Sequence, residues 1–231
     1  MNTVFSLLLN AVSSRTAVLL ATAILGTTSA PKAQSLDVDV VRDPNADLAI
    51  YTATVQAPPG SNATLMLGLQ SSFPGVLIPG IFNPLLLNPN SIFALPIPVT
   101  VGPRGGVAQF RAPLIATSLF EIPFQAFVID PLSQLALTNW TTAVHGLGDL
   151  NTTWTGGSKQ GGQRYELTVQ NAVPGAVLRL TVGGQQATAT VDLAGSATFD
   201  MNANATPGTS VQLTQSVAGG AQTAVGQWTI R

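Results

Sequence analysis

The stretch that decides the fold is Tyr51-Thr-Ala-Thr-Val-Gln56, which returns in altered form as Tyr165-Glu-Leu-Thr-Val-Gln170. In both copies every second residue suits a buried face and the residues between are mostly polar, which is the period of a half-buried β-strand. Each copy leads into a turn, Pro59-Gly60 or Pro174-Gly175, and then into a second apolar strand. The recurrence predicts two copies of one β-rich module.

Further landmarks recur in the same order along the chain. They are Gly106-Val-Ala108-Gln-Phe110 with Gly195-Ser-Ala197-Thr-Phe199, Gln125 with Gln212, and Trp140 with Trp228. The pattern predicts an all-β protein with two tandem β-sandwich, immunoglobulin-like modules. We expect the first module over residues 36–146 and the second over 151–231, joined by a linker near 146–150. A length of 231 residues suits two domains of roughly 100 residues each.

Several strands outside the repeated landmarks can also be predicted. Alternation predicts a first strand at Asp37–Val41, and apolar runs predict strands over residues 122–130, 135–143, 209–217 and 222–230. The glycine-rich run over residues 156–162 predicts a flexible segment near the start of the second module. No stretch after residue 35 has sustained helical periodicity.

The N-terminus resembles an export signal. Arg15 precedes an apolar run over residues 16–25, and a small-residue region follows. The run is shorter than the roughly 20 apolar residues that span a bilayer, although an uncleaved anchor or a buried helix remains an alternative. We therefore predict a signal peptide over residues 1–33 and a secreted or cell-surface protein without a stable transmembrane segment after cleavage. The absence of cysteine suits an oxidising compartment.

The chain is poor in charge. Only 8% of its residues are charged, against about 25% in an ordinary soluble protein. No basic field is available for nucleic acid, and no polybasic stretch for an anionic membrane. Sheet edges are normally guarded by charges, so the scarcity of charge suggests self-association or strand addition to a neighbour. The expected partners are other copies, envelope or matrix components, or a polysaccharide.

The first copy carries an apolar, proline-rich insertion over residues 69–98 that the second copy lacks. Prolines at several places prevent this segment from forming a membrane helix. One interpretation is a strand pair that covers an end of the first sandwich. The other is a loop that contacts a partner or a surface, with Phe73 and Phe82 as candidate contact residues.

The sequence contains little that indicates catalysis. His145 is the only histidine, and with no cysteine the chain lacks the usual zinc ligands; we expect His145 at the surface near the module boundary. A glycosidase needs two carboxyl groups across a cleft, and Glu121 with Asp130 is a possible pair, but the aromatic platforms of a sugar cleft are scarce. We predict no enzyme activity, no cofactor and no metal.

Asp43-Pro-Asn45-Ala-Asp47 has the spacing with which calcium loops begin. Leu48 stands where such a loop needs glycine, and Thr54 where it needs glutamate. A turn capped by Asp or Asn side chains is the favoured interpretation, and a calcium site is the alternative.

Three tryptophans are distinguished by their positions. Trp140 and Trp228 lie at equivalent places near the ends of the two copies and are expected to fill the two cores. Trp154, at the module junction, is the candidate for an exposed ligand contact. A carbohydrate-binding alternative predicts exposed aromatic side chains with Asn and Gln nearby, either Trp154 or Tyr51 and Tyr165.

The first module resembles secreted β-sandwich repeat modules of planctomycete-type bacteria. The residues that carry the resemblance are Pro59-Gly60, Leu67-Gly68, Leu85-Leu-Leu-Asn-Pro89, Gly106-Val-Ala108, Gln125-Ala-Phe-Val128-Ile-Asp130 and Leu137-Thr-Asn139. The second module departs from this pattern and is similar to a generic bacterial immunoglobulin-like repeat. The resemblance implies extracellular modules without assigned chemistry and transfers no catalytic residue. Together these observations favour a non-catalytic structural or adhesive protein, with an extracellular carbohydrate-binding module or a secreted hydrolase as alternatives.

Overall fold

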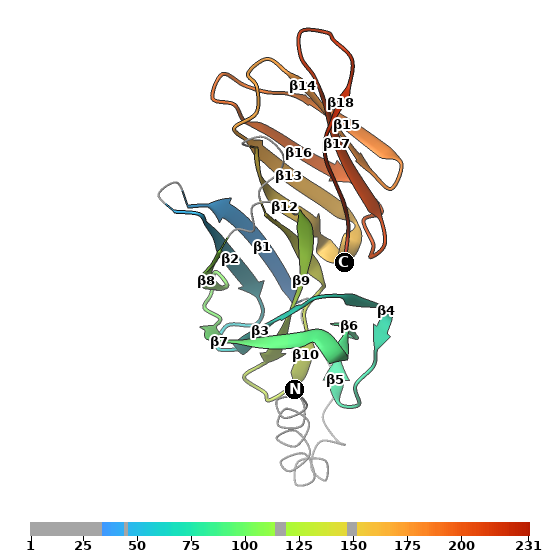
Figure 1. The fold of residues 1–231 in the computed structure, drawn as a ribbon. Helices are drawn as coiled ribbons and strands as arrows, with labels where there is room; N and C mark the ends of the chain where they lie inside the picture. Colours follow the sequence, from blue (N-terminus) through green and yellow to red (C-terminus); the bar gives the residue numbers. More distant parts are fainter. Residues whose placement is uncertain (1–33, 44–45, 114–118, 147–151) are drawn as a thin grey trace. The chain divides into compact units, whose positions relative to one another are not determined.

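The computed structural model describes residues 34–43, 46–113, 119–146 and 152–231 (Figure 1). These residues belong to one compact unit, Lys32–Arg231. The predicted signal peptide and the centre of the predicted linker lie outside the described residues. The described part is almost entirely β-structure, so the predicted all-β, tandem β-sandwich class is confirmed.

The first module consists of two main sheets and a small two-stranded sheet. One sheet has the order β1-β2-β8, with β1 at Ser35–Arg42, β2 at Leu48–Gln56 and β8 at Gly106–Pro113. The other has the order β5-β10-β9-β3-β7, and β11 also pairs with β9. Its strands are β3 (Asn62–Gly68), β5 (Ile81–Phe82), β7 (Ile92–Thr100), β9 (Phe120–Ile129), β10 (Leu135–Leu137) and β11 (Thr141–His145). The small sheet pairs β4 (Ser71–Val76) with β6 (Leu85–Leu87), and a 3₁₀ turn, η2 (Pro89–Ser91), follows.

The second module consists of two sheets. The first has the order β12-β13-β16, with β12 at Thr153–Lys159, β13 at Arg164–Gln170 and β16 at Ala197–Asn202. The second has the order β15-β14-β17-β18. Its strands are β14 (Val177–Val182), β15 (Gln185–Thr190), β17 (Ser210–Ser216) and β18 (Thr223–Thr229), and a 3₁₀ turn, η3 (Gln160–Gly162), follows β12.

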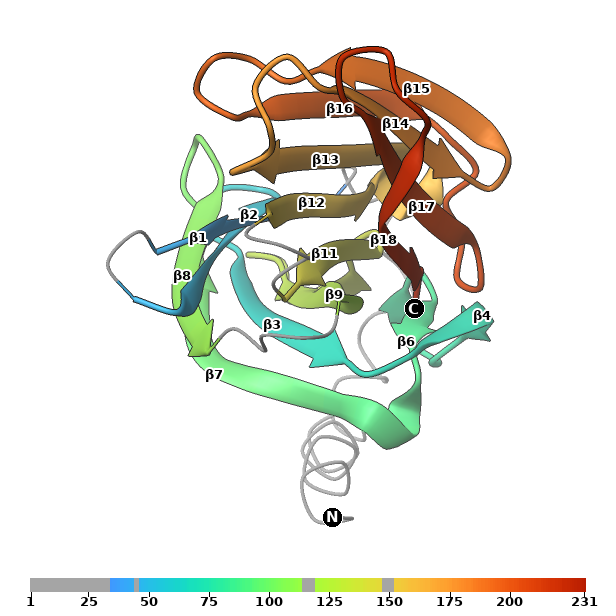
Figure 2. The ribbon, with the colours of Figure 1, turned by 45° about the horizontal axis from the view of Figure 1, so that its top comes forward.

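The strand orders confirm the tandem repeat. The order β1-β2-β8 of the first module returns as β12-β13-β16, and the order β7-β3-β9-β11 returns as β15-β14-β17-β18 (Figure 2). The register of one central pair differs, because Ala108 lies opposite Ala53, whereas Ala197 lies opposite Val169, the counterpart of Val55. The repeated landmarks therefore lie on or beside equivalent strands without matching residue for residue.

The repeated strand forms the centre of each core, as its alternation predicts. Tyr51, Ala53 and Val55 are fully buried, and so are Tyr165, Leu167 and Val169. Trp140 is fully buried and Trp228 retains 5% exposure, so both are core residues. They lie in one hydrophobic cluster, however, and neither belongs to the separate cluster around Tyr51, so the expectation that they fill two cores is wrong. Burial of this aromatic and aliphatic surface supplies the main stabilisation of the fold.

Two predictions about local structure are wrong. The single strand predicted over residues 135–143 is divided into β10 and β11, because Asn139 turns to bind the backbone of Leu36 and Trp140 enters the core. The glycine-rich run predicted to be flexible instead forms β12 and η3. Its glycines serve close backbone contacts, which are described below.

The predicted insertion is partly buried and partly exposed. Residues 69–98 contain β4, β5, β6, η2 and most of β7, but β7 has β15 as its counterpart, so the part that the second copy lacks ends before β7. Leu85 and Leu87 are buried at 4% and 0% exposure, so part of the insertion covers the core. Phe73 and Leu77 stay 50% and 79% exposed, so another part presents apolar side chains to solvent.

Candidate functional site: a buried polar junction between the modules

A carboxyl group from the first module is bound by side chains of the second. Glu121, on β9, retains 1% exposure. It accepts hydrogen bonds from the Tyr165 hydroxyl at 2.6 Å and from Trp228 Nε1 at 3.0 Å. A third bond comes from the Thr142 hydroxyl at 2.5 Å. Because Tyr165 lies on β13 and Trp228 on β18, this single carboxyl group ties β9 to two strands of the second module.

Burial controls the ionisation of this group. Desolvation raises the pKa of Glu121 above its ordinary value, and the three hydrogen bonds act in the opposite direction. Burial, followed by the neighbouring Glu121 charge, raises the pKa of Tyr165 well above 10.0. Burial therefore shifts the titration of both groups to higher pH. Removing either partner would leave buried polar atoms unpaired, which is costly.

Side chains rather than a regular ladder join β11 to β12. The Thr141 hydroxyl donates to the Ser158 carbonyl at 2.8 Å, and the Ser158 amide donates to the Thr142 hydroxyl at 2.6 Å. The backbones are so close that a methyl group on Gly157 would lie 2.6 Å from the Thr142 carbonyl oxygen. Glycine is therefore required at this position by the junction itself.

The neighbouring residue Gly156 is equally constrained. Its φ is +112°, and a Cβ there would lie 2.1 Å from the Glu166 carbonyl oxygen of β13. In the first module the equivalent register position, opposite Ala53, carries Val38. The second module has glycine at this position because the backbones of β12 and β13 lie too close there for a side chain.

Lys159 fastens the start of the first module to β12. Its side chain is 3% exposed, and Nζ donates to the carbonyl of Val38. The same nitrogen lies 3.0 Å from Asp37 and 3.3 Å from Asp39. The ammonium group donates to acceptors on β1, and these interactions compensate for the hydration that it loses on burial.

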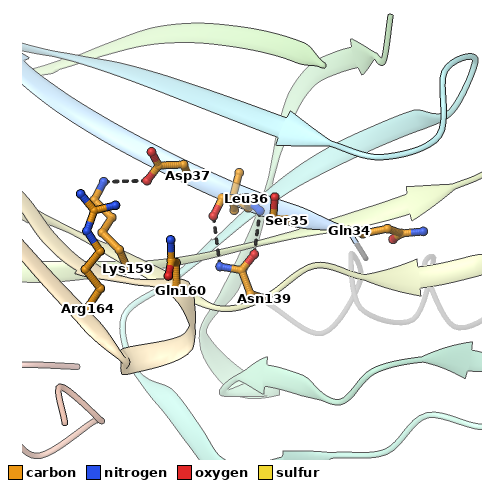
Figure 3. A pocket seen from close by; sticks show the side chains of 8 residues that line it. All are labelled: Gln34, Ser35, Leu36, Asp37, Asn139, Lys159, Gln160 and Arg164. Atoms are coloured by element: carbon orange, nitrogen blue, oxygen red, sulfur yellow. Dashed lines mark hydrogen bonds and ion pairs between the residues drawn. The ribbon is translucent and has the colours of Figure 1, made fainter. Parts of the chain in front are cut away.

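A polar pocket lies beside this lysine (Figure 3). Its volume is about 360 Å³, and it is lined by Gln34, Ser35, Leu36, Asp37, Asn139, Lys159, Gln160 and Arg164. The Asn139 amide is held by two hydrogen bonds to the Leu36 backbone, as Figure 3 shows. Arg164 is paired with Asp200 at 2.6 Å, so both cations that line the pocket are neutralised by nearby carboxylates.

The structure contradicts the predicted exposure of several residues. Trp154 is 3% exposed and packs edge-on against Trp228, with ring centroids 5.6 Å apart. Its expected role as an exposed contact is therefore wrong, because it fills the junction. His145 is also not on the surface: it is 4% exposed and hydrogen-bonded to the Tyr51 hydroxyl. Tyr51 and Tyr165 are fully buried, so neither can stack on a sugar.

The candidate hydrolase and calcium residues are accounted for by other contacts. Glu121 is sealed in the junction, whereas Asp130 caps a turn by accepting from the amides of Leu132 and Gln134. Asp47 pairs with Arg42 at 2.9 Å, and Asp43 lies 4.0 Å from Arg111. Asn45 lies outside the described residues. Within the ranges that the structure describes, no group of His, Cys, Asp and Glu side chains could hold a metal ion.

Phe73 and Phe82 keep the exposure expected of contact residues. They are 50% and 41% exposed, and Phe73 packs edge-on against Trp140 at 6.2 Å. Other exposed apolar residues of the insertion are Leu69, Val76, Leu77 and Phe93. No charged residue occurs between Asp47 and Arg104, so the insertion itself carries no charge, although its Ser71 hydroxyl donates to the carbonyl of Arg231.

Sequence reasoning missed the linking role of Glu121 and the anchoring role of Gln125. Gln125 is fully buried and its amide binds the Leu86 amide and the Pro84 and Thr138 carbonyls, each at 2.9 Å. The available signal was that Glu121 and Gln125 are the two polar side chains of the otherwise apolar strand β9. Such a residue must find partners when it is buried, but the sequence does not indicate which ones.

No protein-family profile matches this chain, and no curated protein matches it. Among solved structures, it is similar to a tetra-tandem repeat in the extending region of a large adhesion protein, at 16% identity and a TM-score of 0.28, covering 86% of this chain and 49% of that one. It is also similar to a 1.5-MDa bacterial ice-binding adhesin, at 11% identity and a TM-score of 0.28, covering 87% of this chain and 63% of that one. A third is the fibronectin(III)-like modules of Clostridium thermocellum CbhA, at 10% identity and a TM-score of 0.27, covering 85% and 93%.

The chain thus spans about half the length of the first of these structures. The likeness is to β-rich repeat and fibronectin-like modules and brings no functional residue with it. None of the helical segments that the structure describes has the length and apolar character needed to span a bilayer.

Proposed function

We propose that this protein is a non-catalytic structural or adhesive component of the cell surface or extracellular matrix, exported by a signal peptide over residues 1–33. The observation that carries the proposal is the buried junction, in which Glu121 accepts hydrogen bonds from Tyr165 and Trp228. A junction of this kind couples two tandem modules into one stiff unit, whereas a bare linker would let them swing. Stiffness suits a protein that holds a position or bears a load.

The environment of the ionisable groups favours this role over catalysis. A perturbed pKa indicates a functional site only when the group also faces a cleft that substrate can enter. Glu121, Tyr165, Tyr51 and His145 all have shifted pKa values. All four are at most 4% exposed, and each is hydrogen-bonded to another protein group. These polar groups therefore form hydrogen bonds inside the protein and do not face a substrate.

The adhesive contact is proposed to lie on the apolar insertion, with Phe73 and Phe82 among the contact residues. Exposed apolar residues are individually unremarkable, but a group of them in a segment without charge marks an interaction surface. Leu77, Phe73 and Phe82 are 79%, 50% and 41% exposed in this one insertion. The proposed partners are envelope or matrix components with apolar surfaces, in a planctomycete-type bacterium.

The experiment is to fractionate the source cells, locate the protein and read its N-terminus by mass spectrometry. We expect a start near residue 34 and retention in the envelope or matrix fraction. Leu77→Ser combined with Phe82→Ser should release the protein into the medium. Leu132→Ser is the matched control, because Leu132 is 77% exposed but lies outside the insertion. An intact Met1 in the cytoplasm would refute the proposal.

A second candidate function, glycan binding, is favoured by the pocket of Figure 3. Its amide and hydroxyl side chains suit the hydroxyl groups of a neutral sugar, and its paired charges do not favour an anion. Because all three tryptophans are buried, their fluorescence is a poor reporter. Calorimetry against a glycan panel, with Gln160→Ala as the variant, tests this alternative. Absence of heat with every glycan would remove it.

A further inference from the structure

The second module has a sheet edge that lacks the usual protection against pairing with another chain. β15, Gln185-Gln-Ala-Thr-Ala-Thr190, pairs with β14 and with no other strand that the structure describes, so one row of its backbone groups is not in a ladder. Gln185, Gln186, Thr188 and Thr190 are exposed. The strand contains no charged residue and no proline. Each of those features normally protects an edge from pairing with another chain.

The equivalent edge of the first module is protected. β7 occupies the place of β15 in the repeated strand order, and it carries Pro96 and Pro98. Proline lacks the N–H group that a ladder requires, so these residues block strand addition there. The two copies of one fold therefore differ in whether this edge can pair.

Other edges are protected by different means. The Val38 carbonyl on β1 accepts from Lys159. β8 carries Arg111 and Pro113, and β16 carries Asp200 paired with Arg164. The opposite edge of the β15 sheet is β18, whose pairing is interrupted by a register shift and whose Gly226 lies against Trp154. Among the longer edge strands that the structure describes, β15 has no charge, no proline and no covering group.

The sequence of β15 suits pairing with itself. Ala187 and Ala189 face the core and are half-buried, whereas Gln186, Thr188 and Thr190 face outward. An antiparallel pairing about a two-fold axis at Thr188 places Ala187 opposite Ala189 and Gln186 opposite Thr190 of a second copy. A pairing about Ala187 places Gln186 opposite Thr188. Both registers keep Gln186, Thr188 and Thr190 outward and the two alanines inward, and the register about Ala187 places Gln185 opposite Ala189 at the end of the inward face.

We propose that β15 is a self-association edge, at which two copies of this chain join their β15-β14-β17-β18 sheets into one continuous antiparallel sheet. The contact is isologous, so it closes as a dimer. Main-chain hydrogen bonds give the affinity, as in other cases of strand addition. The low charge of the strand removes the repulsion that would otherwise oppose the meeting of identical edges. This inference rests on the proposed structural role and names a partner for it.

Sedimentation velocity of the full chain, over a series of concentrations, provides the first test. We expect a concentration-dependent dimer. Gln186→Lys with Thr188→Lys places like charges opposite one another in either register and should weaken association by about tenfold. The control is Ser210→Lys with Gln212→Lys, which adds the same charges at the same spacing on exposed positions of the interior strand β17. The control should associate like the natural protein.

Cysteine pairing gives a second test, because the chain has no cysteine of its own. Thr188→Cys should form a disulfide-linked dimer in the first register, and a mixture of Gln186→Cys and Thr188→Cys chains should cross-link in the second. Gln212→Cys should stay monomeric. A chain that is monomeric at every concentration, or a dimer that the β15 lysines leave unchanged, overturns the inference. A monomer that still fractionates with the envelope refutes self-pairing and leaves the structural role intact.

Discussion

The two modules share one strand order but use it in opposite ways. The first module covers its β7 edge with Pro96 and Pro98, and it presents exposed apolar residues on an insertion. The second has no such insertion and leaves the uncharged edge of β15 open. The comparison teaches that the repeated core sets the architecture, whereas edges and insertions give each copy its own surface.

The interiors differ as well, and for a related reason. Gln125 of the first module is buried and binds the insertion, whereas the equivalent Gln212 of the second is exposed on β17. Val38 of β1 is replaced by Gly156 in β12, where the chain must lie close to its neighbours. Each departure from the repeat therefore coincides with a contact that only one copy makes.

The largest effect is expected from Gly156→Ala. A Cβ at this residue would lie 2.1 Å from the Glu166 carbonyl oxygen, and the φ of +112° is strained for any L-residue. We expect a loss of more than about 3 kcal/mol in the free energy of unfolding. Gly161→Ala is the control: its φ is also positive, but its Cβ would meet nothing within 4 Å. If chemical denaturation gives the same midpoint for the two variants, the close contact between the β12 and β13 backbones is not the reason that Gly156 is required.

The next effect concerns the insertion. Gln125→Ala removes three hydrogen bonds from a fully buried side chain and leaves the Leu86 amide without its acceptor. We expect a loss of about 2–4 kcal/mol. Gln212→Ala, the equivalent change in the second module, should cost less than about 0.5 kcal/mol because its side chain is exposed. Hydrogen exchange should report faster opening of β6 in the first variant only, and equal exchange in both would contradict the anchoring role.

A smaller effect distinguishes the coupling of the modules from their internal packing. Tyr165→Phe removes a hydrogen bond to Glu121 across the junction, whereas Tyr51→Phe removes one to His145 inside the first module. Each change should cost about 1–3 kcal/mol. Only Tyr165→Phe should separate the thermal unfolding of the modules, as seen by calorimetry. A single transition in both variants would mean that other contacts suffice to couple them.

The smallest effect is a dependence of stability on pH. Burial lowers the pKa of His145 below 6.5, against a hydrogen bond with the Pro113 backbone that raises it. The unfolded chain therefore binds the proton more tightly, so this contribution to stability is present above pH 6.5 and is lost as the pH falls through the folded-state pKa. His145→Gln should flatten this part of the stability profile.

Glu121 should act with the opposite sign. Its pKa is raised above 4.5, so its contribution is present below pH 4.5 and is lost as the pH rises through its folded-state pKa. Glu121→Gln should remove this loss of stability at rising pH. The two profiles, measured by urea denaturation, distinguish the interior of the first module from the junction, and superimposable profiles for the two variants would contradict the assignment.

Much of the fold could be predicted from pattern. The alternation at Tyr51 and Tyr165 is sufficient to locate the central strands, and Trp140 and Trp228 are buried as predicted, but both lie in one hydrophobic cluster. The site could not be predicted in the same way. The positions of Trp154 and His145 beside a linker predict exposure, but Trp154 packs on Trp228, and His145 packs against Tyr51 and Phe120. Periodicity carries no information on these contacts, because it does not show which remote residues will meet.

The sequence by itself determined the class of fold, the tandem repeat and the shortage of charge, because these follow from local periodicity and composition. Tertiary structure alone decided what the exceptional residues do. Glu121 accepts hydrogen bonds at the junction, Gly156 and Gly157 allow two backbones to lie close together, and β15 forms an unpaired edge. Each of these roles depends on residues elsewhere in the chain. Hydrogen bonds and excluded volume act over a few ångströms in space, and the distance along the chain does not reveal which groups they will bring together.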